Sequence, residues 1–198
     1  MKGILIALEG IDGAGNTTQA KLLSSWLKRK GFKVILTKEP TRGWVGKLIR
    51  RRLKEGRVDA NIEALLFAAD RAEHVAKVIA PSLREGAIVV TDRYFESSIA
   101  YQGAQGAEVE WIEAINSFAP KPALTVVLDL EPRLALSRKH ERREVFEEES
   151  FLEKVREILR RRALEKGYVL VDASKSVKEV HVEVRKAVRH ILKKLQSF

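Results

Sequence analysis

A short apolar run and a glycine-rich segment lie side by side near the start of the chain: Ile4-Leu5-Ile6-Ala7-Leu8, then, after Glu9, Gly10-Ile11-Asp12-Gly13-Ala14-Gly15-Asn16-Thr17-Thr18. The apolar run predicts a buried strand, and the leucine spacing over residues 19–30 predicts a helix soon after the glycines. Glycines in this context let backbone N–H groups turn inward around phosphate oxygens, and the N-terminus of the helix favours negative charge. We therefore expect residues 10–18, the phosphate loop, to bind the phosphates of a nucleotide.

The phosphate loop follows the pattern G-x-x-x-x-G-K-[ST] at every fixed position except one. Thr17 stands where a hydroxyl ligates magnesium, whereas Asn16 occupies the position of the lysine. An asparagine amide donates hydrogen bonds but carries no charge. The alternative is a glycine-rich turn without a ligand, and the strand and helix on either side make that the weaker interpretation.

Four more apolar runs follow along the chain, separated by longer patterns with helical spacing. The runs are rich in β-branched residues and apolar on both faces, which is typical of strands covered by helices on each side. This alternation predicts an α/β fold of three layers, with a five-stranded parallel sheet flanked by helices. The expected strands are 4–8, 34–36, 87–90, 124–128 and 168–171, and the expected helices include 19–30, 62–83 and 177–195.

Length and composition limit the classes of protein to consider. A chain of 198 residues suits one compact domain, and no repeat or linker divides residues 1–198. The absence of cysteine excludes disulfides, thiolate metal sites and a cysteine nucleophile. No apolar run approaches the roughly 18 residues of a transmembrane helix, and the run after Gly3 is too short for a signal peptide. We therefore expect a soluble, cytoplasmic protein without membrane contacts.

The formal net charge of +10 favours an anionic partner. Much of the basic charge, however, lies on expected helix faces, as in the runs 28–30 and 160–162, where solvated side chains are usual. We therefore rank nucleic acid as the third hypothesis, behind the binding of small anionic substrates.

A second polar landmark, Thr91-Asp92-Arg93-Tyr94, lies at the end of the third expected strand. Open α/β sheets bind ligands at the carboxyl ends of their strands. A carboxylate there can hold magnesium through water, and the adjacent arginine can clamp a phosphate. The alternative is an ordinary surface ion pair.

The expected helix 62–83 carries an aromatic and a basic residue away from its apolar stripe. Over residues 62–79, at about 100° per residue, Phe67 falls opposite the stripe, and Arg71 lies one turn further on. A ring beside a guanidinium suits stacking and hydrogen bonding to a planar base. The equally good alternative packs Phe67 under a second layer and places Arg71 in a salt bridge. The stripe expected to face the core is Ile62, Leu65, Ala69, Ala72, Ala76 and Ile79.

Together these features resemble the thymidylate kinase family of P-loop nucleoside monophosphate kinases. The resemblance covers nearly the whole chain and implies transfer of a phosphoryl group from ATP, with Mg²⁺, to dTMP. The segments that carry it are Glu9-Gly10-Ile11-Asp12-Gly13-Ala14-Gly15, Lys38-Glu39-Pro40-Thr41-Arg42, Leu66-Phe67-Ala68-Ala69-Asp70-Arg71, and Asp92-Arg93-Tyr94 through Tyr101-Gln102-Gly103.

The resemblance implies roles for individual residues in binding dTMP. Phe67 would stack on thymine, and Arg71 would donate to an exocyclic oxygen. Tyr101 would crowd the 2′ position of the sugar, and Asp12 would lie near the 3′-hydroxyl or the metal. The remaining implied contacts are Arg42, Arg93 and Glu39 at the phosphate end and Ser98 and Gln102 in the base pocket, with Thr17 and Asp92 as metal-binding residues.

The resemblance also implies a lid segment around residues 138–147. The family carries a catalytic arginine either in the phosphate loop or on the lid, and Gly13 in the loop favours the lid here. Arg138 matches the position that packs against adenine, and residues 171–174 resemble the loop that borders it. A solvated helix face remains the alternative for Lys139 and Arg142. The implied catalytic residues are Asp12, Arg93, Arg138, Arg142 and Arg143; all four histidines are expected to be incidental, and a homodimer is implied.

Two rival functions remain open. One is a kinase for another nucleoside monophosphate, and the other is a nucleotide-binding protein without turnover, which Asn16 favours. We expect Asn16 to slow turnover unless a lid arginine or another basic group supplies the missing charge.

Overall fold

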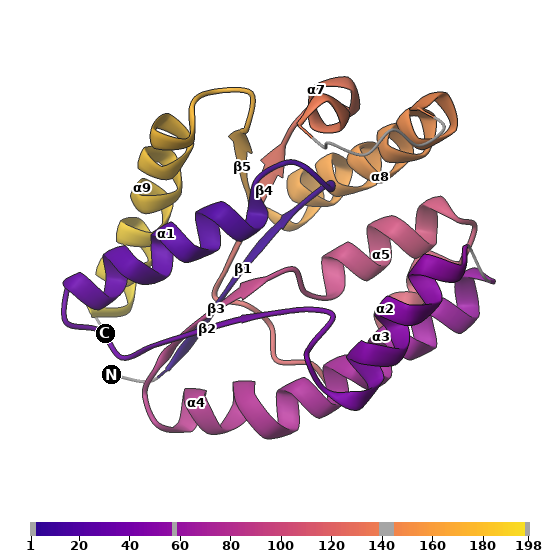
Figure 1. Cartoon of the computed structure of the whole chain (residues 1–198). Helices are drawn as coiled ribbons and strands as arrows, with labels where there is room; N and C mark the ends of the chain where they lie inside the picture. The colour runs from indigo at the N-terminus through magenta and orange to yellow at the C-terminus, as the bar shows by residue number, and fades with distance from the viewer. Residues whose placement is uncertain (1–2, 57–58, 139–144, 197–198) are drawn as a thin grey trace.

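A five-stranded sheet, parallel throughout, forms the centre of the described chain (Figure 1). The computed structural model describes residues 3–56, 59–138 and 145–196. The strand order is β2-β3-β1-β4-β5, which confirms the predicted α/β fold. The strands are β1 (Ile4–Gly10), β2 (Val34–Lys38), β3 (Ile88–Asp92), β4 (Leu124–Asp129) and β5 (Val169–Asp172).

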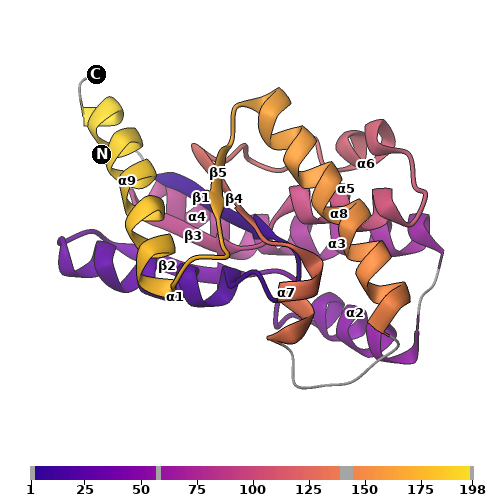
Figure 2. The ribbon, with the colours of Figure 1, turned by 90° about the horizontal axis from the view of Figure 1, so that it is seen from above.

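Helices cover both faces of this sheet, as Figures 1 and 2 show. One face, with Ile6 and Val90, packs against α1 and α9, whereas the other, with Leu5 and Val89, packs against the segment around Ile79. The continuous burial of β1 and β3 explains why both read as unbroken apolar runs. The helices are α1 (Asn16–Arg29), α2 (Trp44–Glu55), α3 (Ala60–His74), α4 (Ala80–Arg84), α5 (Phe95–Ala104), α6 (Val109–Ile115), α7 (Pro132–Ser137), α8 (Val145–Lys166) and α9 (Val177–Gln196), with a π-helical segment, η1 (Val75–Ile79), between α3 and α4.

The register of the sheet brings the carboxyl ends of three strands together. Leu8 of β1 and Lys38 of β2 both lie opposite Asp92 of β3. Because the strands are parallel, their carboxyl ends form one edge, and the phosphate loop leaves β1 at that edge. The sequence features that predicted phosphate and magnesium binding are therefore neighbours in space.

The predicted orientation of the helix 62–83 is wrong. Ile62 and Leu65 are 53% and 52% exposed, and Ala69, Ala72 and Ala76 of the same stripe are also exposed. Among the stripe residues, Ile79 is buried, as predicted. The inner face of α3 instead carries polar side chains, which are stable there because they are hydrogen-bonded to neighbours. These buried residues of α3 are Glu63, Ala64, Ala68, Asp70, Arg71 and His74.

Two helix boundaries also differ from the prediction. The first helix begins at Asn16, three residues before the predicted start, so the phosphate loop runs directly into it. The predicted helix 62–83 is formed by α3, η1 and α4 in succession, with Pro81 in the first turn of α4, where a missing N–H costs little. No helix within the described ranges is long and apolar enough to cross a membrane.

Candidate active site

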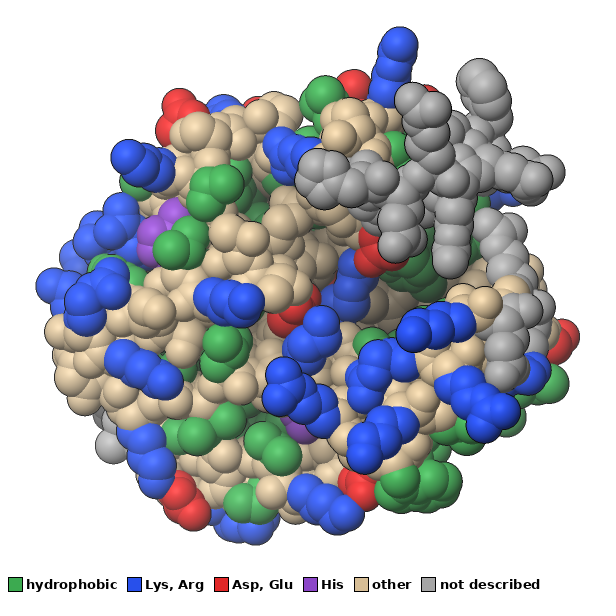
Figure 3. Space-filling model, in the orientation of Figure 1, with side chains coloured by type: hydrophobic (Ala, Val, Ile, Leu, Met, Phe, Trp, Pro, Cys, Tyr) green, Lys and Arg blue, Asp and Glu red, His purple; other side chains and the backbone are tan. Residues whose placement is uncertain are grey.

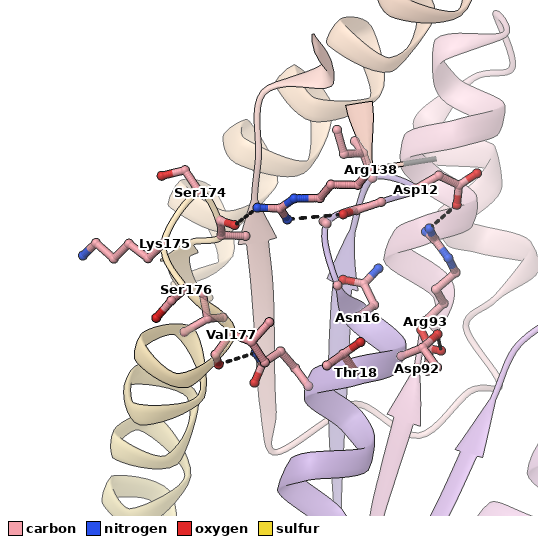
Figure 4. A pocket seen from close by; sticks show the side chains of 18 of the residues that line it. Asp12, Asn16, Thr18, Asp92, Arg93, Arg138, Ser174, Lys175, Ser176 and Val177 are labelled. Carbon is pink, nitrogen blue, oxygen red and sulfur yellow. Dashed lines mark hydrogen bonds and ion pairs between the residues drawn. The ribbon is translucent and has the colours of Figure 1, made fainter. Parts of the chain in front are cut away.

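A first cavity of about 750 Å³ opens where the phosphate loop meets the end of β3 and the turn after β5. Figure 4 shows Asp12, Asn16 and Thr18 of the loop, with Arg93 on one side and the 174–177 turn on the other. The cavity lies at the carboxyl edge of the sheet, where α/β proteins bind ligands. The residues expected to bind ATP line this cavity, except Gly10, which is not among its lining residues.

The loop conformation depends on glycine at two positions. Gly13 and Gly15 have φ values of 89° and 100°, in the left-handed region that other residues rarely adopt. A Cβ on Gly13 would also lie 2.6 Å from the carbonyl oxygen of Ala135. These glycines let the loop turn back to the N-terminus of α1, where N–H groups are free of intrahelical partners.

Asn16 is turned into the loop. Its side chain is buried, and Nδ2 donates to the carbonyl oxygen of Gly10 at 3.2 Å. Oδ1 has no hydrogen-bond partner among the described residues. The amide therefore supports the loop from within and brings no positive charge to the cavity.

Thr17 and Asp92, the two residues predicted to bind a metal, are in contact. The Thr17 hydroxyl donates to Oδ2 of Asp92, whose side chain is almost fully buried. Mg²⁺ is usually bound by one or two protein oxygens together with phosphates and water. A hydroxyl beside a carboxylate at the mouth of a phosphate loop fits that requirement.

Arg93 connects the phosphate loop to α5. Its φ of 71° makes it the one non-glycine residue with positive φ in the described ranges. Nη1 donates to Gly10 O at 2.8 Å and to Ser97 Oγ at 3.0 Å, and Nη2 donates to Asp12 Oδ1 at 2.6 Å. The guanidinium lies 5.1 Å from the ring centroid of Tyr101, whose hydroxyl accepts from the Asp12 N–H at 2.8 Å. Three predicted site residues, Asp12, Arg93 and Tyr101, therefore meet at one point.

Glu9 lies beneath this group and was not predicted. It is fully buried, Oε2 accepts from the Ser97 hydroxyl at 2.5 Å, and Oε1 has no partner within the described chain. Burial raises the pKa of Glu9 to about 8, with the nearby Glu96 carboxylate acting in the same direction and the Ser97 hydrogen bond against it. Glu9 is therefore mostly protonated at neutral pH.

The predicted base pocket contains a buried ion pair. Arg71 is 1% exposed, and its Nε and Nη2 donate to Oε2 of Glu39 at 2.9 and 2.6 Å. Nη2 also donates to Ser98 Oγ at 3.1 Å, and Nη1 donates to Asn116 Oδ1 at 2.5 Å. Arg71 forms the salt bridge that the sequence allowed as an alternative. Phe67, one turn earlier, is half-buried. Among the described residues, these contacts use four of the five guanidinium N–H groups and leave one on Nη1.

Gln102 completes the wall formed by α5. It is buried, its Nε2 donates to Glu63 Oε2 at 3.2 Å, and its Oε1 has no partner among the described residues. Because Gln102 is one helical turn from Ser98, the two side chains leave α5 on the same side. Arg71 thus keeps one N–H, and Gln102 one carbonyl oxygen, without a partner among the described residues.

A second cavity of about 600 Å³ adjoins the first and shares Thr17, Lys38 and Asp92 with it. Arg42, expected to bind the phosphate of dTMP, lines this second cavity and is exposed. The peptide bond before Pro40 is cis. The turn that follows is held by Asp70, which accepts from the Thr41 N–H and hydroxyl at 2.7 and 2.6 Å.

Arg138 lies at the base of the expected lid. It donates to Ala173 O at 3.1 Å, and its Nη1 lies 3.5 Å from Gly13 O, so it bridges the phosphate loop and the turn after β5 (Figure 4). Arg142 and Arg143 lie outside the described residues, as does most of the expected lid.

Sequence reasoning missed several residues of the site. Lys38 and Glu9 stand at the ends of predicted strands, and the rule that ligands gather there could have found them. His74 was expected to be incidental, yet it is buried, with Nδ1 2.9 Å from Glu39 Oε1 and Nε2 2.7 Å from Thr37 Oγ1. Asn116 lies in a segment far along the chain, and no motif around it indicated a place in the site.

Comparisons with known proteins agree with this geometry. The family model for thymidylate kinase matches residues 8–184. A protein of Pyrococcus horikoshii named probable thymidylate kinase is 45% identical over 97% of this chain and 98% of its own length. A protein of the same name from Pyrobaculum aerophilum is 47% identical over 95% of this chain and 97% of its own. The match over nearly the full length, together with the phosphate loop and the Asp92–Arg93 strand end, shows that the chain belongs to the thymidylate kinase family.

Proposed function

We propose that the chain transfers the γ-phosphoryl group of Mg–ATP to the phosphate of dTMP, yielding ADP and dTDP. The family match and the names of the relatives support dTMP as the acceptor. The observation that carries the proposal is the position of Arg93, which joins the phosphate loop through Gly10 and Asp12 to the α5 wall through Ser97. A donor and an acceptor phosphate bound on its two sides would face each other.

On the donor side, the phosphate loop binds the ATP phosphates through its backbone N–H groups and the N-terminus of α1. Arg138 and residues 173–177 border the far end of the first cavity, which suits adenine. Thr17 and Asp92 would hold Mg²⁺, which when bound neutralises charge on the phosphate oxygens.

On the acceptor side, Arg93 exchanges its contact with Asp12 for the phosphate of dTMP, and Arg42 approaches from the second cavity. Tyr101 crowds the 2′ position and so favours deoxyribose, while Asp12 lies near the 3′-hydroxyl. The acceptor phosphate is already anionic, so positioning and charge neutralisation replace a general base.

The base pocket matches the edge of thymine. The remaining Nη1 N–H of Arg71 donates to the O4 carbonyl, and the free Oε1 of Gln102 accepts from the N3–H. Cytosine presents the opposite pattern at both positions, which would leave buried groups unpaired at a cost of about 1–3 kcal/mol each. Phe67 stacks on the ring, and Ser98 and Glu39 hold Arg71 in place.

A lid over residues 138–147 closes the single kinase domain, 1–198, over the reacting phosphates. Arg143 or Arg142 then meets the charge that develops on the transferred group. Since Asn16 brings no charge, turnover depends on a cation from elsewhere in the chain.

A coupled assay of ADP release with ATP, Mg²⁺ and each of dTMP, dUMP, dCMP and dAMP tests the proposal. We expect the largest kcat/KM with dTMP and at least a tenfold lower value with dCMP. Turnover with a different preferred acceptor would overturn the assignment of dTMP.

A nucleotide-binding protein without turnover is the second candidate, and the buried, neutral Asn16 is the observation that favours it. Calorimetry with ATP and with dTMP, run beside the coupled assay, separates the two functions. Binding of both nucleotides without any ADP production would support this candidate.

We also propose a homodimer that buries the exposed apolar side chains of α2 and α3. Trp44, Leu48, Ile62 and Leu65 are 71%, 38%, 53% and 52% exposed, and the two helices pack against each other. Large apolar side chains exposed on two helices that pack together are typical of association sites. Sedimentation should give a dimer for the parent chain and a monomer for Leu65→Glu; a monomeric parent would contradict the proposal.

A further inference from the structure

Lys38 is a charged residue at the active-site edge to which the proposed function gives no role. It is the last residue of β2 and lies opposite Asp92 in the register of β3. Adjacent strands are about 4.8 Å apart, so the two side chains start from neighbouring points of the same edge. Asp92 accepts from Thr17 in the first turn of α1. Lys38 therefore stands beside the pair that would hold Mg²⁺.

Lys38 lines both cavities. The residues common to the two are Thr17, Lys38 and Asp92, so its side chain lies at the boundary between the phosphate loop and the second cavity. It is exposed, and within the described chain its ammonium forms no hydrogen bond or ion pair. By contrast, Lys33 pairs with Glu85 and Lys77 with Glu73, each at 2.5 Å. A free ammonium at this boundary is available to an anionic ligand.

The other cations of the first cavity are engaged or point elsewhere. Arg93 is held by Asp12, and Arg138 donates to the carbonyl oxygen of Ala173. Lys175 belongs to the turn after β5, and Figure 4 shows its side chain pointing away from the phosphate loop. Among the described residues that line the cavity, Lys38 is thus the one cation without a partner beside Thr17.

The phosphate loop has a matching deficit of charge. Asn16 takes the position of the usual lysine and donates back to Gly10, and the loop residues 10–18 include an acidic residue, Asp12, but no basic one. Figure 3 shows Lys and Arg side chains gathered around the hollow in the middle of the molecule. The lysine stem reaches across several ångströms, so a charge from β2 can approach the site from the side opposite the loop.

We propose that Lys38 is a catalytic residue that supplies the charge missing at Asn16, by contacting the β- and γ-phosphate oxygens of ATP from the β2 side. This inference rests on the proposed phosphoryl transfer. It would explain how a chain whose phosphate loop has no lysine transfers a phosphoryl group: the cation comes from the end of β2, which β3 separates from the strand that leads into the loop.

The test is a cycle of variants measured for kcat with dTMP and for the Kd of ATP. Lys38→Met should lower kcat by about 100-fold or more, the loss typical of one well-placed charged donor. Lys38→Arg should stay within tenfold of the parent, because the charge remains. In the Asn16→Lys background, Lys38→Met should lower kcat by less than tenfold, since the loop then carries its own cation.

Lys28→Met is the matched control. Lys28 is an exposed lysine in the last turn of α1 that lines neither cavity, so its removal takes away one positive charge without touching either substrate site. We expect its kcat and its Kd for ATP to equal those of the parent. Thermal melting of each variant shows that it is folded.

The possible failures are distinguishable. If the parent phosphorylates dTMP and Lys38→Met matches Lys28→Met in kcat, the inference is wrong while the proposed function stands. If the parent phosphorylates no nucleoside monophosphate, the proposed function fails, and ATP binding still tests the contact. In that case equal affinities of Lys38→Met and Lys28→Met for ATP overturn the inference, whereas a tenfold weaker Kd for Lys38→Met supports the contact with phosphate.

Discussion

The buried carboxyl of Glu9 makes the stability of the fold depend on pH in a calculable way. Its pKa rises from the ordinary 4.5 to about 8 because the side chain is buried. A group with a higher pKa in the folded chain binds its proton more tightly there. Its contribution to stability is therefore complete below about pH 4.5 and is lost as pH rises through about 8. At about 1.4 kcal/mol per pKa unit, the full effect is about 5 kcal/mol in the free energy of unfolding.

Glu9→Gln replaces the protonated carboxyl by a neutral group of nearly the same shape. Near pH 5 the variant and the parent should melt at similar temperatures. At pH 9.5 the variant should melt about 10–20 °C higher, because each kcal/mol moves the Tm of a chain this long by about 2–4 °C. Differential scanning calorimetry from pH 5 to 9.5 measures the difference, in which the titration of the other groups largely cancels.

Glu85→Gln serves as the control for this experiment. Glu85 is exposed, and the Lys33 ammonium that it accepts from lowers its pKa. Its small contribution therefore has the opposite sign: it is present above the ordinary pKa and lost as pH falls. A difference between Glu9→Gln and the parent that stays constant across the pH range would refute the argument from burial.

Three further predictions concern the proposed site. Phe67→Ala should raise the KM for dTMP by roughly 5- to 150-fold, since a lost aromatic stack costs about 1–3 kcal/mol, and unchanged steady-state kinetics would exclude stacking. Arg71→Met should lower the free energy of unfolding by about 3–5 kcal/mol in urea titrations, because Glu39 stays buried without its main partner; a loss under 1 kcal/mol would contradict this. Arg143→Ala, or Arg142→Ala if the register differs by one, should lower kcat by about 10²–10³ with little change in ATP affinity, and normal turnover of both variants would rule out the lid arginine.

The sheet could be predicted because each strand is apolar on both faces. All five expected strands overlap the observed ones, although β3 and β5 begin one residue later than expected and every observed strand ends one or two residues further on. A strand that is covered on both faces is apolar at successive positions, so local hydropathy alone is enough to predict it. The phosphate loop was equally visible, because its glycines are required by the backbone conformation itself.

The orientation of α3 could not be predicted by the same argument. Its apolar stripe at Ile62 and Leu65 is exposed, and its inner face carries Glu63 and Arg71. The partner that makes this burial favourable for Arg71 is Glu39, 32 positions away in the sequence. A prediction from hydropathy places charged residues at the surface. It therefore gives the wrong inner face for a helix whose buried charges pair with residues far away in the sequence.

The sequence motifs identified several site residues but not the contacts between them. Asp12, Arg93 and Tyr101 were each singled out by position or resemblance, but their mutual contacts depend on the left-handed conformation of Arg93. The spacing of motifs contains no information on that φ angle. Whether Asp12 lies nearer the sugar or the metal stays a prediction.

Two buried ion networks converge on α5 from opposite sides. Arg71 of α3 donates to Ser98, and Arg162 of α8 donates to Oε1 of Glu96 at 3.0 Å, an oxygen that also accepts from the Tyr168 hydroxyl at 2.6 Å. Buried ion pairs contribute little net stability, because desolvation offsets their attraction, but removing one partner is costly. Their consequence is therefore geometric: α5 cannot rotate or shift without breaking one network. The helix that carries Tyr101 and the other residues proposed to read dTMP is held in position before any nucleotide binds, so binding energy is not spent on ordering it.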